Sequence, residues 1–272
     1  MQPHDTIDTM QQFPYWRTQD TDKPLFPDVE WNKPEQRSLR GRLGIIGGNK
    51  LGFAGVAEAY GTALSAGAGE VKVLLPDVLR KTIPPAITEA VFAPNNISGS
   101  LSKEALGDMQ NLGAWSTGIL LAGDAGKSSE TTVVYDDFIE SYSGWITLTR
   151  DAVDLVRRSA PVIVERNRTL YVLSFAQLQK LFQDVYYPKI LTFSMQLAQL
   201  VENVHKFTLS YPVTLMTLHQ GYLVIAHEGQ VVTQKWDNPM AIWRGQTAAR
   251  AASALLWHPK PLEALAASIT TR

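Results

Sequence analysis

Two glycines, an asparagine and a lysine stand together where a short apolar run ends, at Gly47-Gly48-Asn49-Lys50. The run before them, residues 43–46, reads as a buried strand, and small residues at helical spacing follow from Ala54. Backbone N–H groups at the start of such a helix can bind a polar or anionic ligand, and glycines let that ligand approach closely. Alternatively, the glycines only allow the helix to pack tightly on the sheet. The residues alone leave both interpretations open.

A second glycine-containing segment, Gly123-Asp-Ala-Gly-Lys-Ser128, lies between an expected buried strand and an expected helix. Glycines, a lysine and a hydroxyl in that setting could hold phosphates and Mg²⁺. However, Leu121 stands where the phosphate loop of nucleoside triphosphatases has its first glycine, and a side chain there would crowd the loop. The missing glycine argues against that kind of loop.

The composition indicates a globular protein with a sizeable core, because 45% of the 272 residues are hydrophobic and 19% are charged. A net charge of −1 argues against electrostatic binding to nucleic acid or membranes. The chain has no cysteine, which excludes disulfides, thiolate metal sites and a cysteine nucleophile. Its five histidines show no metal-ligand spacing, and the polar N-terminus is unlike a signal peptide. We expect no metal site and a cytoplasmic location.

The elements that must position these residues alternate between strand and helix as far as about residue 180. A short helix is expected at 77–83, a strand at 86–93 and a longer helix at 189–205. Three strands follow at 213–218, 222–226 and 230–233, separated by turns at glycines. This pattern predicts an α/β fold: a doubly wound, mostly parallel sheet with helices on both faces and antiparallel strands at one edge.

The domain organisation expected from the sequence is a single domain preceded by an arm. Residues 1–40 contain five prolines and several aromatic residues, which is typical of an irregular segment laid over a domain surface. Residues 41–272 contain no linker, repeat or low-complexity tract. We therefore predict an irregular N-terminal arm over 1–40 and one α/β domain over 41–272.

The stretch from Gly41 to Pro76 resembles the opening of the ribokinase-like NAD(P)H-hydrate dehydratases, whose pattern is roughly GxxxxIGGSxxxxGAxxLAxxAALRxGAGxVxVxxP. The chain has Ile46-Gly47-Gly48-Asn49, Gly55-Val56 and Gly67-Ala68-Gly69 at matching intervals. The order of elements remains similar to residue 272, with Ala122–Gly126 in the place of the family's GPGLG. The resemblance implies a ribokinase-like α/β fold.

The resemblance also implies a substrate site at the glycine turns and at Ile146–Val153, which is similar to the family's DADAL turn. There Asp151 is kept and Thr149 replaces the first aspartate. Considered alone, Asp151 could equally be the N-cap of its helix. The family's TPHxGE signature is absent between Tyr171 and Leu178. The positions implied to bind substrate are Gly48, Asn49, Lys50, Gly55, Gly126 and Asp151.

The segment Asn238–Thr247 resembles the family run NPGMAxGGTGD, which carries the catalytic aspartate and an anion hole. Thr247 stands at the aspartate position, and Trp243, Arg244 and Gln246 replace glycines. Threonine has no pKa that suits a general base near neutrality, and bulky side chains would obstruct a backbone phosphate site. Arg244 could itself bind phosphate. The positions implied to bind nucleotide are His219, where the family has the lysine of an LKG strand, and Asn238, Arg244, Gly245 and Gln246.

These residues predict a diverged NAD(P)H-hydrate dehydratase-like protein that is inactive or very weak and retains nucleotide or small-ligand binding. The alternative is an active ADP- or ATP-dependent dehydratase, or a related small-molecule kinase, that uses Asp151 or Asp237 as its base. The resemblance implies ADP or ATP and an NAD(P)H-type ligand as cofactor and substrate. It also implies a homo-oligomer, with neither nucleic acid nor a membrane as a partner.

Overall fold

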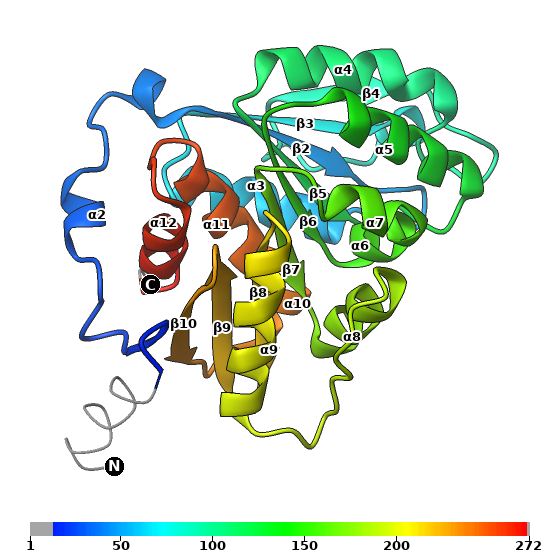
Figure 1. The fold of residues 1–272 in the computed structure, drawn as a ribbon. Helices are drawn as coiled ribbons and strands as arrows, with labels where there is room; N and C mark the ends of the chain where they lie inside the picture. Colours follow the sequence, from blue (N-terminus) through cyan, green and yellow to red (C-terminus); the bar gives the residue numbers. More distant parts are fainter. Residues whose placement is uncertain (1–12, 271–272) are drawn as a thin grey trace.

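The structure is a computed structural model that describes residues 13–270, in which ten strands form one sheet (Figure 1). Their spatial order is β1-β10-β9-β8-β7-β6-β5-β2-β3-β4. The strands are β1 (Trp16–Gln19), β2 (Arg42–Gly47), β3 (Glu70–Pro76), β4 (Ala90–Ala93), β5 (Gly118–Gly123), β6 (Trp145–Thr149), β7 (Thr169–Leu173), β8 (Thr214–His219), β9 (Tyr222–His227) and β10 (Gln230–Lys235).

The pairing confirms the predicted mostly parallel sheet with antiparallel strands toward one side. Every neighbouring pair from β4 to β8 is parallel, whereas β8–β9 and β9–β10 are antiparallel. The two hairpin turns contain Gly221 and Gly229, whose φ angles of 77° and 75° are ones that glycine adopts without strain. All the parallel strands therefore end at the same edge of the sheet.

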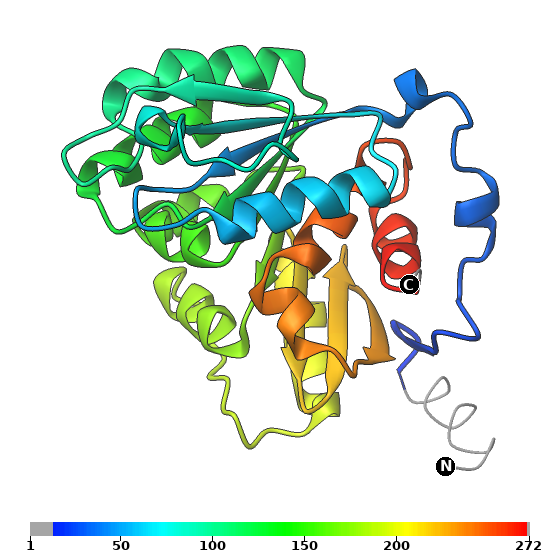
Figure 2. The same cartoon turned by 180° about the vertical axis from the view of Figure 1, so that it is seen from behind.

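Helices cover both faces, as the alternation of strands and helices predicted (Figures 1 and 2). Ile45 and Ile46 illustrate the division, since these neighbours in β2 are both fully buried but belong to the cores on opposite faces. One face carries α4 (Leu106–Trp115), α5 (Ser129–Ser141), α6 (Asp151–Leu155), α7 (Ala160–Ile163), α8 (Phe175–Asp184) and α9 (Leu197–Ser210). The other carries α3 (Ala54–Ser65), α11 (Gln246–Leu255) and α12 (Pro261–Ser268).

The N-terminal arm contains regular structure that the sequence analysis did not predict. β1 pairs in parallel with β10, and α2 (Asp28–Trp31) and a 3₁₀ turn (Arg37–Arg40) follow it. The Gln19 side chain, 2% exposed, donates to Gln234 Oε1 and to the Ala266 carbonyl, both at 2.8 Å. A four-residue strand is too short to show a recognisable local pattern. Its stability comes from partners that are distant in sequence. Residues 1–12 of the arm lie outside the described residues.

Several predicted boundaries were wrong. The helix expected at 77–83 is only a 3₁₀ turn at Asp77–Leu79, and the strand expected at 86–93 is limited to β4. The helix expected from residue 189 begins at Leu197, where Gln196 and Gln199 form a capping box. Further 3₁₀ turns lie at Lys103–Ala105 and Arg157–Ser159, and a short helix α10 (Pro239–Trp243) precedes α11.

Candidate functional site

The candidate site lies where β2, β5 and β6 end, beside the first turns of α3 and α11. β2 and β5 are neighbours, and the Gly48 N–H beyond β2 donates to the Gly123 carbonyl at 3.0 Å. Gly48 and Gly123 both have φ near +82°, a conformation that favours glycine. Ligands of open α/β sheets commonly bind at this edge, outside the carboxyl ends of parallel strands. The loops that follow the three strands supply the polar groups described below.

Asp124, directly after β5, connects these loops through hydrogen bonds in four directions. Its N–H donates to Asp151 Oδ1 at 2.7 Å, and its carbonyl accepts from Asn49 Nδ2 at 2.5 Å. Its carboxylate accepts from the Gly55 N–H at 2.7 Å, within the first turn of α3, and from Arg150 Nη2 at 2.6 Å. The Asp124 backbone, with a φ of 54°, is thereby fixed in the left-handed region.

Arg150, directly after β6, extends its side chain into the space between α3 and α11. A Cβ atom added at Gly55 would lie 1.3 Å from Arg150 Nη1, and one added at Gly245 would lie 3.6 Å from Arg150 Cδ. The guanidinium therefore packs directly on the α3 backbone, beside the residue that precedes α11. Nη2 pairs with Asp124, whereas Nη1 is buried and makes no hydrogen bond to any residue from 13 to 270. The Arg150 side chain is 24% exposed.

The backbone of Arg150 is strained and supported from the other side. Its φ of 56° and ψ of −139° are usual only for glycine. Gln177 Nε2 donates to the Arg150 carbonyl at 2.7 Å and to Asp154 Oδ2 at 2.8 Å. Gln177 also completes a capping box with Ser174 at the start of α8. The α8 N-terminus thus positions the residue that enters the site.

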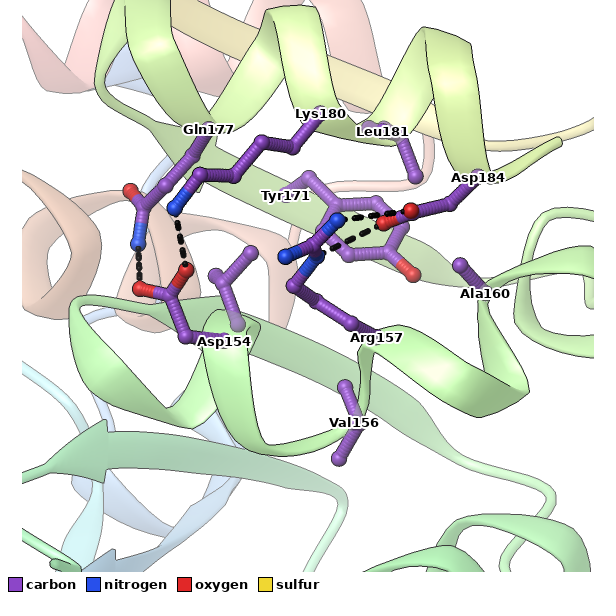
Figure 3. A pocket seen from close by; sticks show the side chains of 10 residues that line it. Asp154, Val156, Arg157, Ala160, Tyr171, Gln177, Lys180, Leu181 and Asp184 are labelled. Atoms are coloured by element: carbon purple, nitrogen blue, oxygen red, sulfur yellow. Dashed lines mark hydrogen bonds and ion pairs between the residues drawn. The ribbon is translucent and has the colours of Figure 1, made fainter. Parts of the chain in front are cut away.

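Figure 3 shows the polar cluster that surrounds this support. Gln177 and Lys180 of α8 both contact Asp154, and Arg157 makes a bidentate pair with Asp184 at 2.8 and 2.7 Å. The cavity between these side chains measures about 10 Å³, which is the space of a single water molecule. The cluster joins α6 to α8 and offers no room for a ligand.

Asp151 is not the N-cap that one interpretation of the sequence proposed. It is the first residue of α6, after Arg150, and no side chain caps that helix. The carboxylate instead accepts the Asp124 N–H, and a Cβ atom added at Gly123 would lie 2.3 Å from Asp151 Oδ1. Burial raises the pKa of Asp151; the nearby Asp124 carboxylate raises it further, while the hydrogen bond from Asp124 and the charge of Arg150 oppose the rise.

The start of α11 forms the other half of the site. Gly245 precedes the helix with a φ of 85°, no side chain caps it, and its first turn has no acidic residue. Thr247, in that first turn, is 2% exposed, and its Oγ1 has no hydrogen-bond partner among the described residues. It borders a cavity of about 380 Å³ between the end of β10, α11 and the end of α12. Gln246, Trp236, Asp237 and Asn238 are among the other residues that line this cavity.

The structure brings most of the implied substrate residues together on the α3 side. Asn49, Gly55 and Asp151 bond Asp124, and Gly48 bonds the preceding residue, Gly123. Gly126 lies beside Asn49, since a Cβ atom added there would be 3.5 Å from Asn49 Nδ2. Lys50 is exposed, and its Nζ donates to the Ile97 carbonyl at 3.5 Å.

The residues implied to bind nucleotide do not all lie at the same place. Asn238 and Gln246 line the cavity, and Gly245 adjoins it. His219 is 5% exposed, stacks on Phe175 and bonds the Met195 carbonyl at 2.8 Å, and it does not line the cavity.

The sequence predicted that bulky side chains would obstruct a backbone phosphate site at the start of α11. In the structure, the side chain that fills space beside this helix end is that of Arg150. Trp243 is 55% exposed, and the Arg244 side chain is 58% exposed and lies 3.7 Å from Glu58. The non-neighbouring atoms within 4 Å of a Cβ added at Gly245 are Arg150 Cδ and the Gly55 carbonyl oxygen. Arg150 therefore occupies the side of α11 that faces α3.

Three residues of this site were not singled out from the sequence: Asp124, Arg150 and Gln177. The sequence did contain one indication of this site: Arg150 is a charged residue directly after a buried strand, where the similar family has alanine in its DADAL turn. The direction of the Arg150 side chain could not be predicted, because it depends on a left-handed backbone conformation that hydrophobic periodicity does not reveal. Within residues 13–270, no three histidine, aspartate or glutamate side chains are grouped as metal ligands, and no helix is long and apolar enough to cross a membrane.

Comparisons with known proteins connect the chain to others through its structure. No family model and no curated protein sequence matches it. A ribokinase-like superfamily protein from Enterococcus faecalis has a similar structure, with a TM-score of 0.71 and 16% identity over 95% of this chain and 86% of that one.

Two Bacillus subtilis structures are also similar, each over 88% of this chain and 85% of the other, with 11% identity. One is a UPF0031 family member described as a putative kinase, with a TM-score of 0.63. The other, with a TM-score of 0.59, is an ADP/ATP-dependent NAD(P)H-hydrate dehydratase co-crystallised with ATP and Mg²⁺. The sheet order, the helices on both faces and these structural neighbours show that the chain has the ribokinase-like fold.

Proposed function

We propose that this protein binds a nucleotide at the N-terminus of α11 and does not dehydrate hydrated NAD(P)H at an ordinary rate. The observation that carries the proposal is the buried Thr247 hydroxyl, which has no hydrogen-bond partner within residues 13–270. By the resemblance, Thr247 stands at the position of the family's catalytic aspartate. A hydroxyl cannot act as a general base near neutrality, but it can donate a hydrogen bond to a phosphate oxygen.

Nucleotide binding is supported by the α11 side of the site, where a cavity adjoins the start of the helix. The first N–H groups of α11 have no side-chain cap and no acidic neighbour in the first turn, so they favour a bound anion. The adjoining cavity of about 380 Å³ falls within the usual size of small-molecule pockets. Trp236, Asn238 and Gln246 line it and would contact the rest of the ligand. The Bacillus subtilis dehydratase of the same fold was crystallised with ATP and Mg²⁺.

The absence of dehydratase turnover is supported by the α3 side of the site, which the protein's own side chains fill. The Arg150 guanidinium and the Asp124 carboxylate fill the space between Gly55 and Gly245. A positioned general base typically contributes about 10²–10⁴-fold to a rate. Without one, and with the adjoining space occupied by the protein's own side chains, dehydration would be close to the uncatalysed background.

A second candidate is an active dehydratase or small-molecule kinase in which Asp151 is the base. The raised pKa of Asp151 favours it, because a buried carboxyl at a strand end is a common catalytic arrangement. Its Oδ1, however, already accepts the Asp124 N–H. Asp237 borders the cavity and is the other acid that could serve. Measurable turnover that disappears in Asp151→Asn or Asp237→Asn would favour this candidate.

Calorimetric titration with ADP and with ATP, alongside turnover of hydrated NADH with each, tests the proposal. We expect binding by the wild type and no turnover above background. Thr247→Val, which keeps the shape and removes the hydroxyl, should weaken binding about ten- to a hundredfold, since hydrogen bonds to charged groups contribute about 1.5–3 kcal/mol.

Thr217→Val is the matched control, because Thr217 is 1% exposed, also has an unpartnered hydroxyl and does not line the cavity. Equal loss in the two variants would contradict the role of Thr247. Absence of binding by the wild type would overturn the proposal as a whole, as would robust turnover.

A further inference from the structure

Charged groups of both signs meet at the junction of α3 and α11. Both helices begin there, and neither has an acidic residue in its first turn. A helix N-terminus acts as roughly half a positive charge. The Arg150 guanidinium lies between the two, and the Asp124 carboxylate is the group that bonds both Arg150 and the α3 N-terminus. The Asp124 carboxylate therefore lies near the Arg150 guanidinium and near the N-termini of α3 and α11.

Two further carboxylates and a second arginine lie near the junction. Glu58, one turn into α3, lies 3.7 Å from Arg244, which brings a second cation. Asp151 accepts the Asp124 N–H, and burial raises the pKa of its carboxyl. The charged groups at the junction are therefore close to balance, and what favours a bound anion there is unpaired donors rather than net charge.

Two donors at this junction have no acceptor in the part of the chain that the structure describes. Arg150 Nη1 is buried against Gly55, and the Thr247 hydroxyl is buried in the first turn of α11. Buried donors in folded proteins nearly always have partners, so each unpaired one calls for an explanation. If Arg150 served only to fill space, nothing would favour leaving one arm of its guanidinium unpaired. An anion at the start of α11 would provide acceptors for both groups.

We infer that Arg150 binds the terminal phosphate of a polyphosphate ligand and makes the site selective for the number of phosphates. The inference rests on the proposed nucleotide site and identifies the side chain that contacts the terminal phosphate of its ligand. The cavity lies on one side of the α11 N-terminus and Arg150 on the other, with its Cδ close to Gly245. A ligand in the cavity reaches Arg150 only if its phosphate chain extends past the helix end.

The test is a series of affinities for AMP, ADP, ATP and inorganic triphosphate, measured by calorimetry at fixed salt. For the wild type we expect affinity to rise with each added phosphate. In Arg150→Gln, ATP and triphosphate should each lose on the order of tenfold, as expected for one charge-assisted contact, while AMP is unchanged. Arg150→Lys, which keeps the charge without the planar fork, should lose less.

Arg168→Gln is the matched control. Arg168 also has a left-handed backbone, with a φ of 59°, but it is exposed and lies just before β7, at the opposite end of the strands. Its loss removes the same charge without touching the site, so the affinity series should be unchanged. Circular dichroism and melting curves of all variants establish that each is folded before its affinities are compared.

Each outcome separates the inference from the function on which it rests. A wild-type series that is flat with phosphate number, or a series that is the same in Arg150→Gln, overturns the inference while nucleotide binding stands. Triphosphate binding that depends on Arg150, without binding of any nucleotide, supports the inference and overturns the proposed function. Failure of the wild type to bind any of the four probes overturns both.

Discussion

The Asp124 carboxylate and the Arg150 guanidinium lie 2.6 Å apart, although each is carried by a backbone that non-glycine residues rarely adopt. Asp124 follows β5 and Arg150 follows β6, so the pair joins the ends of two neighbouring parallel strands. Left-handed conformations at such positions cost of order 1–3 kcal/mol each and persist only where the surroundings hold them. This pair closes the α3 side of the site and leaves the α11 side open.

Strain at position 150 can be measured by comparing Arg150→Gly with Arg150→Ala. Both variants lose the ion pair, but only glycine adopts a φ of 56° with a ψ of −139° without strain. We expect the glycine variant to be more stable by about 1–2 kcal/mol in urea unfolding. At Arg158, whose backbone is not left-handed, the same two substitutions provide the control. Equal stability of the two position-150 variants would show that the backbone there is relaxed.

Packing of the guanidinium on Gly55 predicts an energetic coupling between the two positions. In Gly55→Ala, the new Cβ would overlap Arg150 Nη1, so the guanidinium must move and its pairing with Asp124 weakens. We expect a loss of about 1–3 kcal/mol, typical of overpacking. The same substitution in an Arg150→Gln background should cost less, giving a coupling of about 1 kcal/mol in a double-mutant cycle. Additive losses would mean that the two residues do not meet.

The fold could be predicted because its signals are local and repeated. The apolar run before Gly47, the small residues of α3 and the alternation of strands and helices each indicate their own element, and parallel pairing follows from the crossovers. β1 could not be predicted in this way. It is four residues long, and what stabilises it is the pairing of Trp16–Gln19 with β10, more than 200 residues away in sequence.

The candidate site was predicted only in part, for a related reason. Glycines such as Gly48 and Gly55 could be found, because tight turns and close approaches require that residue type. What fills the space beside them could not, since Arg150 reaches Gly55 across two strands and from an unusual backbone conformation. For the same reason the expected obstruction was assigned to Trp243, Arg244 and Gln246; the structure places the first two largely in solvent and Gln246 in the lining of the cavity.

The arm should contribute measurably to stability through Gln19. Its side chain donates to Gln234 Oε1 and the Ala266 carbonyl in a buried setting, so Gln19→Ala leaves both acceptors without this donor. We expect a loss of about 1–3 kcal/mol in the free energy of unfolding. Gln36→Ala, an exposed position on the same arm, should change it little. A similar small effect at both positions would mean that the arm is only loosely attached.

The raised pKa of Asp151 predicts a pH dependence of stability with a definite sign. The folded protein holds this proton more tightly than the unfolded chain, whose carboxyl has the ordinary value of 3.8. The contribution is therefore complete below that value and is lost as the pH rises through the folded-state pKa. Asp151→Asn can still accept the Asp124 N–H but does not titrate. Between about pH 3 and pH 7, the wild type should lose stability relative to this variant; a constant difference would contradict the pKa shift.

Restoring the family's acid alone should not restore catalysis. Thr247→Asp supplies a carboxylate at the start of α11, but Arg150 and Asp124 still occupy the space between that helix and Gly55. The new carboxylate would also compete with phosphate for the α11 N–H groups. We expect dehydration of hydrated NADH to stay at background and ATP affinity to fall. Thr247→Asn, uncharged and of similar size, controls for shape and should weaken ATP binding less. Full activity in Thr247→Asp would show that the missing base is the sole defect of the site.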